Sequence, residues 1–123
     1  MQTQLKKVLA AVGDLFFAVK IGDAVKRAGL SLEFAKDDKD VLTKAKENPT
    51  LIIFDLNYPN VQALKVIAKL KANAETRAIS LIGFVSHVQG ELKQQAQEAG
   101  CDMVLARSAF SQNLPQILKR HSS

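Results

Sequence analysis

Apolar residues in this chain gather in short runs, each followed by a stretch in which apolar residues recur at helical spacing. Short apolar runs bounded by turn residues indicate buried strands, and a period of three to four residues indicates amphipathic helices. The runs predict strands at residues 8–12, 30–35, 51–54, 79–85 and 103–106. The other stretches predict helices at residues 15–28, 37–47, 59–72 and 91–99, with a last helix that carries Leu114, Ile117 and Leu118 and ends near His121.

The alternation of strand and helix predicts parallel strands that are joined by right-handed crossovers. Five such units in 123 residues make an α/β protein, a three-layer α/β/α sandwich with helices on both faces of the sheet. Gly29 and Gly100 are placed to end helices, and Asn48-Pro49 stops another. We find no linker, internal repeat or low-complexity segment, so we expect residues 1–123 to form a single domain.

The composition narrows the classes of function. The apolar fraction of 47% and the charged fraction of 24% are those of an ordinary globular domain. Trp is absent and aromatic residues are few, so a stacking surface for nucleic acid is not expected, although the net charge is +5. No apolar run reaches the ~18 residues that a membrane span needs, and the N-terminus lacks the order of a signal peptide. We therefore expect a cytoplasmic protein.

Two features of the composition are interpreted as structural. Cys101 is the only cysteine, which excludes an internal disulfide, and its place at the start of an apolar run predicts a buried thiol rather than a reactive one. The densest basic stretch is Lys65, Lys69 and Lys71, whose spacing fits the solvated outer face of one helix.

The strongest candidate for chemistry is Asp55. It ends the apolar run Leu51-Ile52-Ile53-Phe54, and the turn residues Asn57-Tyr58-Pro59 follow at once. A buried parallel strand of this kind delivers its last side chain to the carboxyl edge of the sheet, where open α/β sheets bind ligands.

Three motifs in order resemble the receiver domain of bacterial two-component response regulators, the CheY-like superfamily, over almost the whole chain. They are Leu-Ile-Ile-Phe-Asp-Leu-Asn-Tyr-Pro, Leu-Ile-Gly-Phe-Val-Ser and Ala-Gly-Cys-Asp-Met-Val-Leu-Ala-Arg. The resemblance implies a flavodoxin-like fold with five helices and strand order 2-1-3-4-5. It also implies that Asp55 matches the phosphoryl acceptor, Asn57 a position whose carbonyl helps to hold Mg²⁺, and Ser86 the hydroxyl position. Arg107 stands where the family has Lys.

The chain departs from the family where the metal should bind. Val12 and Gly13 replace the acidic pair after the first strand. Asp14 lies one place beyond that pair, and we interpret it first as the N-cap of the next helix and only second as a metal ligand. The family's glycine after the acceptor turn, its aromatic switch residue and its proline after the lysine are replaced as well, by Ala63, Val104 and Ser108.

These departures lead to a hypothesis about charge. Asp55 and Arg107 would balance each other without a metal, and the planar guanidinium can grip a carboxylate through two hydrogen bonds. We therefore hypothesise that Arg107 pairs with Asp55 and replaces both the metal and the lysine.

The sequence then predicts a stand-alone signalling domain, with no cofactor and no enzymatic activity, that acts by protein–protein contact without Mg²⁺-dependent phosphorylation. The alternative is a receiver that is phosphorylated on Asp55 and binds Mg²⁺ weakly through Asp14, Asp55 and Asn57. A third interpretation is a flavodoxin-like enzyme or ligand-binding module, which the absence of a glycine-rich phosphate loop disfavours.

The resemblance also implies a surface for partners. In the family this surface is the fourth helix, fifth strand and fifth helix, which here correspond to residues 89–99, 103–106 and 110–120. Candidate contacts are Phe110, Leu105 and Gln95. A histidine kinase, another regulator or a second copy of the chain would bind there. His87 and His121 have no partner at metal-ligand spacing, and we interpret both as structural or solvated.

Overall fold

Strands and helices alternate along the chain, as the apolar pattern predicts. The computed structural model describes residues 6–85 and 90–122. The strands are β1 (Lys7–Ala11), β2 (Ser31–Phe34), β3 (Leu51–Asp55), β4 (Ser80–Val85) and β5 (Met103–Ala106). The helices are α1 (Leu15–Arg27), α2 (Asp38–Ala45), α3 (Ala63–Ala72), α4 (Gly90–Ala99) and α5 (Arg107–Arg120). Within the described part of the chain, no helix is long and apolar enough to cross a membrane.

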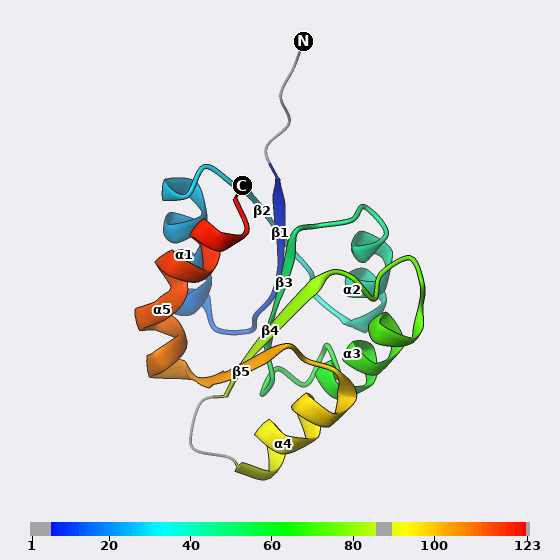
Figure 1. The fold of residues 1–123 in the computed structure, drawn as a ribbon. Helices are drawn as coiled ribbons and strands as arrows, with labels where there is room; N and C mark the ends of the chain where they lie inside the picture. Colours follow the sequence, from blue (N-terminus) through cyan, green and yellow to red (C-terminus); the bar gives the residue numbers. More distant parts are fainter. Residues whose placement is uncertain (1–5, 86–89, 123) are drawn as a thin grey trace.

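The strands form one sheet in the order β2-β1-β3-β4-β5, and every pairing is parallel. This confirms the predicted order and the predicted three layers. Helices α1 and α5 pack together on one face of the sheet, and α2, α3 and α4 cover the other (Figure 1). β3 lies in the middle of the sheet, so its carboxyl end is flanked by the carboxyl ends of β1 and β4.

Alternate residues of the central strands face two separate apolar cores. In β3, Ile52 and Phe54 pack toward α2, α3 and α4, whereas Leu51 and Ile53 pack toward α1 and α5. The second core contains three aromatic rings with centroid separations of 4.7 Å, 5.7 Å and 4.9 Å for the pairs Phe17–Phe84, Phe17–Phe110 and Phe84–Phe110. Aromatic pairs at such distances add about 0.5–1.5 kcal/mol beyond the burial of their area.

The start of α3 corrects one prediction. The sequence predicted a helix from Pro59, but α3 begins at Ala63. The residues before it form tight turns, in which the N–H of Tyr58 donates to the carbonyl of Asp55 and the N–H of Gln62 donates to the carbonyl of Pro59. Gln62 is left-handed, with φ of 51°, which a continuous helix cannot contain. This turn brings Tyr58 close to the end of β1.

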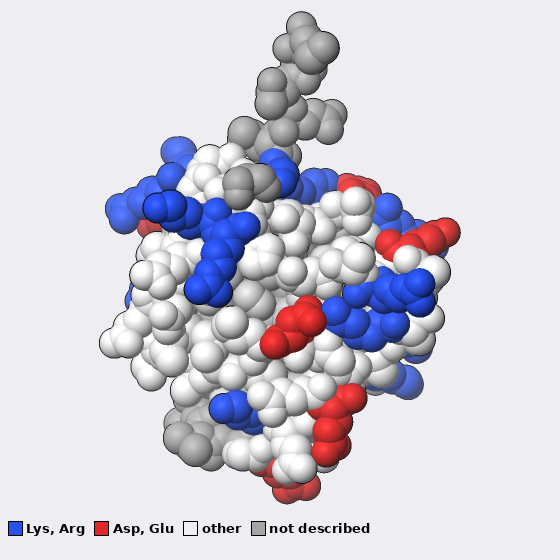
Figure 2. Space-filling model, in the orientation of Figure 1, with Lys and Arg blue, Asp and Glu red and all other residues white. Residues whose placement is uncertain are grey.

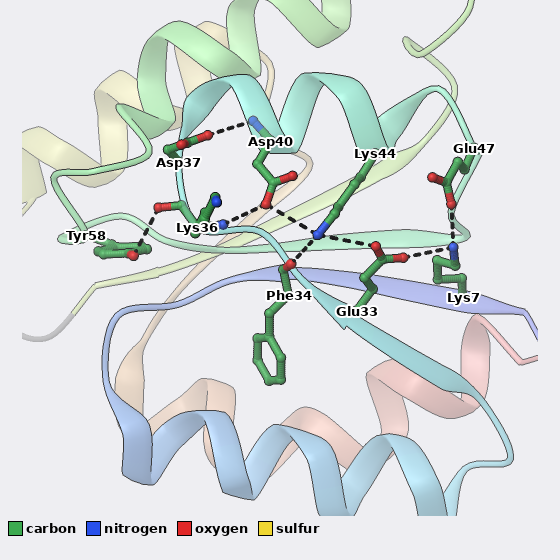
Figure 3. A network of polar contacts seen from close by, with 9 residues as sticks. All are labelled: Lys7, Glu33, Phe34, Lys36, Asp37, Asp40, Lys44, Glu47 and Tyr58. Carbon is green, nitrogen blue, oxygen red and sulfur yellow. Dashed lines mark hydrogen bonds and ion pairs between the residues drawn. The ribbon is translucent and has the colours of Figure 1, made fainter.

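A network of ion pairs lies between α2 and the strands β1 and β2, of which β2 is at the edge of the sheet (Figure 3). Lys44 donates to the carbonyl oxygen of Phe34 at 2.8 Å and pairs with Glu33 and Asp40. Lys7 pairs with Glu33 at 2.9 Å, and hydrogen bonds from Lys7 and Lys44 lower the pKa of the Glu33 carboxyl. Charged side chains of this kind protect an open edge from pairing with another strand.

Lys71 has a structural contact in place of the predicted solvated position. Its Nζ donates to Asp102 at 3.1 Å and to the carbonyl of Arg77 at 3.2 Å, and Asp102 accepts from the N–H of Leu81 at 2.8 Å. The Lys71 stem lies so close to Gly100 that a Cβ there would be 2.6 Å from Cγ, and Gly100 also has φ of +116°. These contacts join the end of α3 to the turn before β5.

Candidate functional site

Asp55 closes β3 at the carboxyl edge of the sheet, where the sequence predicted it. The four residues before it, 51–54, are fully buried, whereas Asp55 itself is partly exposed. Its Oδ1 accepts a hydrogen bond from the backbone N–H of Asn57 at 3.0 Å, and its Oδ2 accepts a longer one from the backbone N–H of Gly13 at 3.5 Å. The carboxylate therefore lies between the loop that leaves β1 and the loop that leaves β3.

Burial raises the pKa of the Asp55 carboxyl above its ordinary value, while the N–H groups of Asn57 and Gly13 oppose this rise. Burial disfavours the charged form, and hydrogen-bond donors favour it. Among the described residues, no Lys or Arg forms an ion pair with Asp55. Its two hydrogen bonds from described residues both come from backbone N–H groups, those of Asn57 and Gly13.

The ring of Tyr58 lies against Gly13. A Cβ added to Gly13 would be 2.7 Å from Cδ1 of Tyr58 and 3.0 Å from Cε1, closer than real Cβ atoms approach a ring. The Tyr58 hydroxyl donates to the carbonyl of Lys36 at 3.1 Å, as Figure 3 shows, and it accepts from the Asn60 side chain at 3.3 Å. The ring therefore fills the space that a side chain at position 13 would need.

Arg107 does not pair with Asp55, which makes that hypothesis wrong. Its guanidinium forms an ion pair with Oδ2 of Asp14 and lies over the ring of Phe17, 4.6 Å from the centroid. The other oxygen of Asp14, Oδ1, accepts from the N–H groups of Phe16 and Phe17, so Asp14 is the predicted N-cap of α1. Arg107 is the first residue of α5 and joins that helix to the start of α1. The guanidinium therefore contacts Phe17 and Asp14 instead of Asp55.

Comparison with known proteins bears on this arrangement. No protein-family model matches the sequence, and a search of curated proteins finds no match. Solved structures do match. A chemotaxis response regulator of Vibrio cholerae, CheY4, has a TM-score of 0.81 at 21% identity, with 96% of this chain and 99% of that chain covered. The fold is that of a response-regulator receiver domain.

Two further structures have the same receiver fold. A response regulator from Hahella chejuensis has a TM-score of 0.84 at 18% identity, and the match covers 94% of each chain. The phosphorylated cyanobacterial phytochrome response regulator RcpA has a TM-score of 0.77 at 17% identity, with 94% of this chain and 90% of that chain covered. The likeness therefore extends over nearly the whole of each domain.

The residues around Asp55 do not fit Mg²⁺, the cation that the receiver fold implies. Mg²⁺ requires a near-octahedral set of oxygen ligands that includes one or two carboxylates. Of the set Asp14, Asp55 and Asn57, Asp14 is already engaged by the α1 N–H groups and Arg107. The described residues contain no cluster of three or more His, Cys, Asp or Glu side chains that could hold a metal. Asp55 is left as a single carboxylate.

We expect Asp55→Asn to have a higher free energy of unfolding than the wild type at neutral pH, and this gain to shrink at acid pH. The pKa of Asp55 is raised on folding, so the stability gained from its protonated form is present below the unfolded pKa and is lost as pH rises through the folded pKa. The unfolding free energies of variant and wild type should therefore differ more at about pH 7 than at about pH 3, where both side chains are neutral. Urea unfolding at the two pH values measures this.

The pH-dependent part of this difference should stay below about 1 kcal/mol, because solvent screens a partly exposed charge. A constant offset between the two proteins at all pH values would reflect lost hydrogen bonds and not titration of the carboxyl. A difference that grows toward acid pH would contradict the prediction.

The remaining candidate residues from the sequence are Ser86, His87, Cys101 and His121. Ser86 and His87 lie outside the described residues. Cys101 is buried, its Sγ contacts the carbonyls of Leu81 and Met103, and burial raises the pKa of its thiol to about 11. This confirms a structural thiol. His121 follows α5, and its Nδ1 lies 2.8 Å from the carbonyl of Ile117, so it has a structural contact at that helix end.

Of the three residues predicted to contact a partner, only Gln95 is exposed. Phe110 is fully buried between Phe17 and Phe84, so its proposed role as an exposed anchor is wrong. Leu105 is partly buried, and Gln95 is exposed on α4. Apart from Gln95, these candidate residues offer little area to a partner.

An apolar face at the start of α1 was not predicted from the sequence. The exposed fractions are 82% for Leu15, 90% for Phe16, 65% for Val19 and 42% for Phe34 of β2, and we name these four residues the α1 apolar face. A hollow of about 490 Å³ lies beside it, lined by Leu15 and Phe34 among others and reaching Tyr58. The sequence could have predicted this face, because Leu15, Phe16 and Val19 do not lie on the helix face of the buried residues Phe17 and Ile21.

Proposed function

We propose that this chain is a receiver-like signalling domain that acts through protein contacts and does not depend on Mg²⁺ or on phosphorylation of Asp55. The observation that carries the proposal is the Tyr58 ring against Gly13. The ring fills the space that an acidic side chain at position 13, where a receiver holds its metal, would need. The ion pair between Arg107 and Asp14 supports the same conclusion, because it engages the residue at the family's lysine position away from Asp55. The domain is proposed to be cytoplasmic and not an enzyme.

The partner is proposed to bind the α1 apolar face. Exposed aromatic and aliphatic side chains of this size anchor protein interfaces when they lie together. Leu15 and Phe34 of this face line the hollow that reaches Tyr58. Asp14, the N-cap of α1, precedes Leu15 and forms the ion pair with Arg107. A histidine kinase or another regulator fits this role by analogy with response regulators. A homodimer through α4, β5 and α5 is the second arrangement to test.

Acetyl phosphate with MgCl₂, followed by intact-mass measurement, tests the proposal. We expect the mass of the wild-type protein to stay unchanged, because no second carboxylate among the described residues is placed beside Asp55 to hold the Mg²⁺ that would neutralise the incoming phosphoryl group. Asp55→Asn is the matched control for modification at other residues. A stoichiometric phosphoryl adduct on wild type that is absent from Asp55→Asn would overturn the proposal.

The alternative function is a phosphorylatable receiver with weak dependence on metal. It is favoured by one observation: Asp55 is partly exposed at the carboxyl edge of the central strand, where the family's acceptor lies. A Mg²⁺ titration followed by amide chemical shifts separates the two functions. Shifts centred on Asp55, Asn57 and Gly13 would support the alternative, and unchanged amides at these positions support the metal-independent function.

A further inference from the structure

A groove of about 610 Å³ lies between α1 and α5, away from Asp55. Its residues come from the middle and the last turns of the two helices, including Arg27 and Lys119. These helix ends lie toward the amino edge of the sheet, whereas Asp55 lies at the carboxyl edge. The groove is therefore a second concavity, separate from the receiver site. Its volume falls within the ~300–1,000 Å³ of small-molecule sites.

The floor of the groove is apolar. Ala24 of α1 and Ala28, the residue that caps this helix, lie one turn apart, and Leu114 and Pro115 of α5 line the groove with them. The two alanines carry only methyl groups, which leaves the hollow between the helices. Pro115 lies inside α5 and has no N–H, so the carbonyl of Ser111 one turn earlier lacks its usual helical donor.

The rim of the groove is basic. Lys20, Arg27 and Lys119 line it, with Asp23 as the single acid. None of these three cations forms an ion pair with a described residue, unlike Lys7, Lys44, Lys71 and Arg107. Figure 2 shows Lys and Arg side chains gathered at the upper left, over the helix ends that Figure 1 places there. The helix dipole accounts for cations in the last turns of α1 and α5, but Lys20 lies mid-helix.

The absence of large exposed apolar side chains distinguishes this groove from a protein interface. All four residues of the α1 apolar face lie outside it. Protein interfaces gain most of their affinity from large aromatic or Arg anchors that fill pockets on the partner. A concave floor of alanine, leucine and proline beneath unpaired cations instead complements a small molecule that carries its own apolar body and an acid.

We propose that the α1–α5 groove binds a small organic anion. Its apolar body lies over Ala24, Ala28 and Leu114, and its carboxylate, sulfonate or phosphate is held by Arg27 and Lys119. Lys20 lies seven residues before Arg27, about 10 Å along the helix, and is within reach of a second polar group on a longer ligand. Such a ligand contacts both helices and stabilises their packing.

The test uses two probes that share one apolar body. 8-Anilinonaphthalene-1-sulfonate carries an acid, and N-phenyl-1-naphthylamine is the same body without it. We expect the sulfonate to bind with a dissociation constant of tens of micromolar, the range of a ligand of its size. The variant Arg27→Gln/Lys119→Gln should weaken its binding at least about tenfold and leave binding of the neutral amine unchanged, because each contact to a charged group is strong.

Lys65→Gln/Lys69→Gln is the matched control, because it removes the same charge from α3 outside the groove. It should change the affinity for the sulfonate less than about twofold. Amide shifts should locate the probe between Ala24, Ala28 and Leu114. The proposal is overturned if the shifts centre on Phe16 and Phe34, or if both double variants weaken binding equally. It is also overturned if an acidic Glu/Leu peptide binds the groove more tightly than the sulfonate.

Discussion

Phe110→Ala is expected to lower the free energy of unfolding by about 3–5 kcal/mol, the cost of removing a large buried aromatic side chain. Phe110 is fully buried and stacks on Phe84 with ring centroids 4.9 Å apart, while Phe17 contacts it from α1. The ring therefore joins α5 to both the sheet and α1. A loss of this size is a large part of the ~5–15 kcal/mol that holds a domain folded. Chemical unfolding followed by circular dichroism measures it.

Phe16→Ala is the matched control, since it makes the same exchange at a side chain that is 90% exposed. It should change the unfolding free energy by less than about 0.5 kcal/mol. Phe110→Leu keeps much of the buried volume and gives an intermediate loss if Phe110→Ala fails to fold. A cost for Phe16→Ala as large as that for Phe110→Ala would contradict the assignment of Phe110 to the core and of Phe16 to the exposed α1 apolar face.

The fold could be predicted because burial dictates the pattern of each element. Residues 51–54 are apolar at every position because both faces of the central strand are covered. Gly29 and Gly100 were predicted to end helices, and their φ values of +75° and +116° are those that favour glycine at such positions. The start of α3 could not be predicted, since Pro59 is favourable both in a first helical turn and in the tight turn that is observed.

Within the candidate site, local features were predicted and contacts between distant segments were not. Asp14 as an N-cap depends only on its neighbours in sequence, and that prediction is confirmed. The partner of Arg107 depends on how α5 packs against α1, because the ring of Phe17 holds the guanidinium beside Asp14. The contact of Tyr58 with Gly13 likewise depends on the turn after β3.

The burial of Phe110 could have been predicted from periodicity. Phe110 precedes Leu114 by four residues and Ile117 by seven, which places all three on one face of a helix. The structure buries that whole face. Only the analogy with the family's signalling surface favoured an exposed Phe110, and here the helical spacing was the better guide.

Gly13→Asp is expected to destabilise the protein by about 2–4 kcal/mol. The new Cβ would lie 2.7 Å from the Tyr58 ring, and overpacking of this kind costs about 1–3 kcal/mol. The added carboxylate also lies beside Asp55, since the N–H of Gly13 faces Oδ2 at 3.5 Å, and like charges oppose each other at that range. Thermal and chemical unfolding without metal measure the loss.

Adding Tyr58→Ala should turn this destabilised pair of acids into a cation site. Removing the ring opens the space at position 13, and two carboxylates beside each other then supply what Mg²⁺ requires. At an MgCl₂ concentration of about ten times the dissociation constant, binding stabilises the double variant by about 1.4 kcal/mol, which is a rise of about 4 °C in Tm. Gly13→Asn/Tyr58→Ala has nearly the same volume without the charge and should show no rise.

The comparison of these variants separates two reasons for the missing metal. If Tyr58 blocks the position, Gly13→Asp alone gains nothing from MgCl₂, because the Lys36 carbonyl and Asn60 hold the ring in place. If only the missing acid matters, Gly13→Asp binds Mg²⁺ without a change at Tyr58, and the ring has no part in excluding the metal. A Tm that rises with MgCl₂ in the wild-type protein would refute both explanations, since Arg107 engages Asp14 and no second carboxylate among the described residues is free beside Asp55.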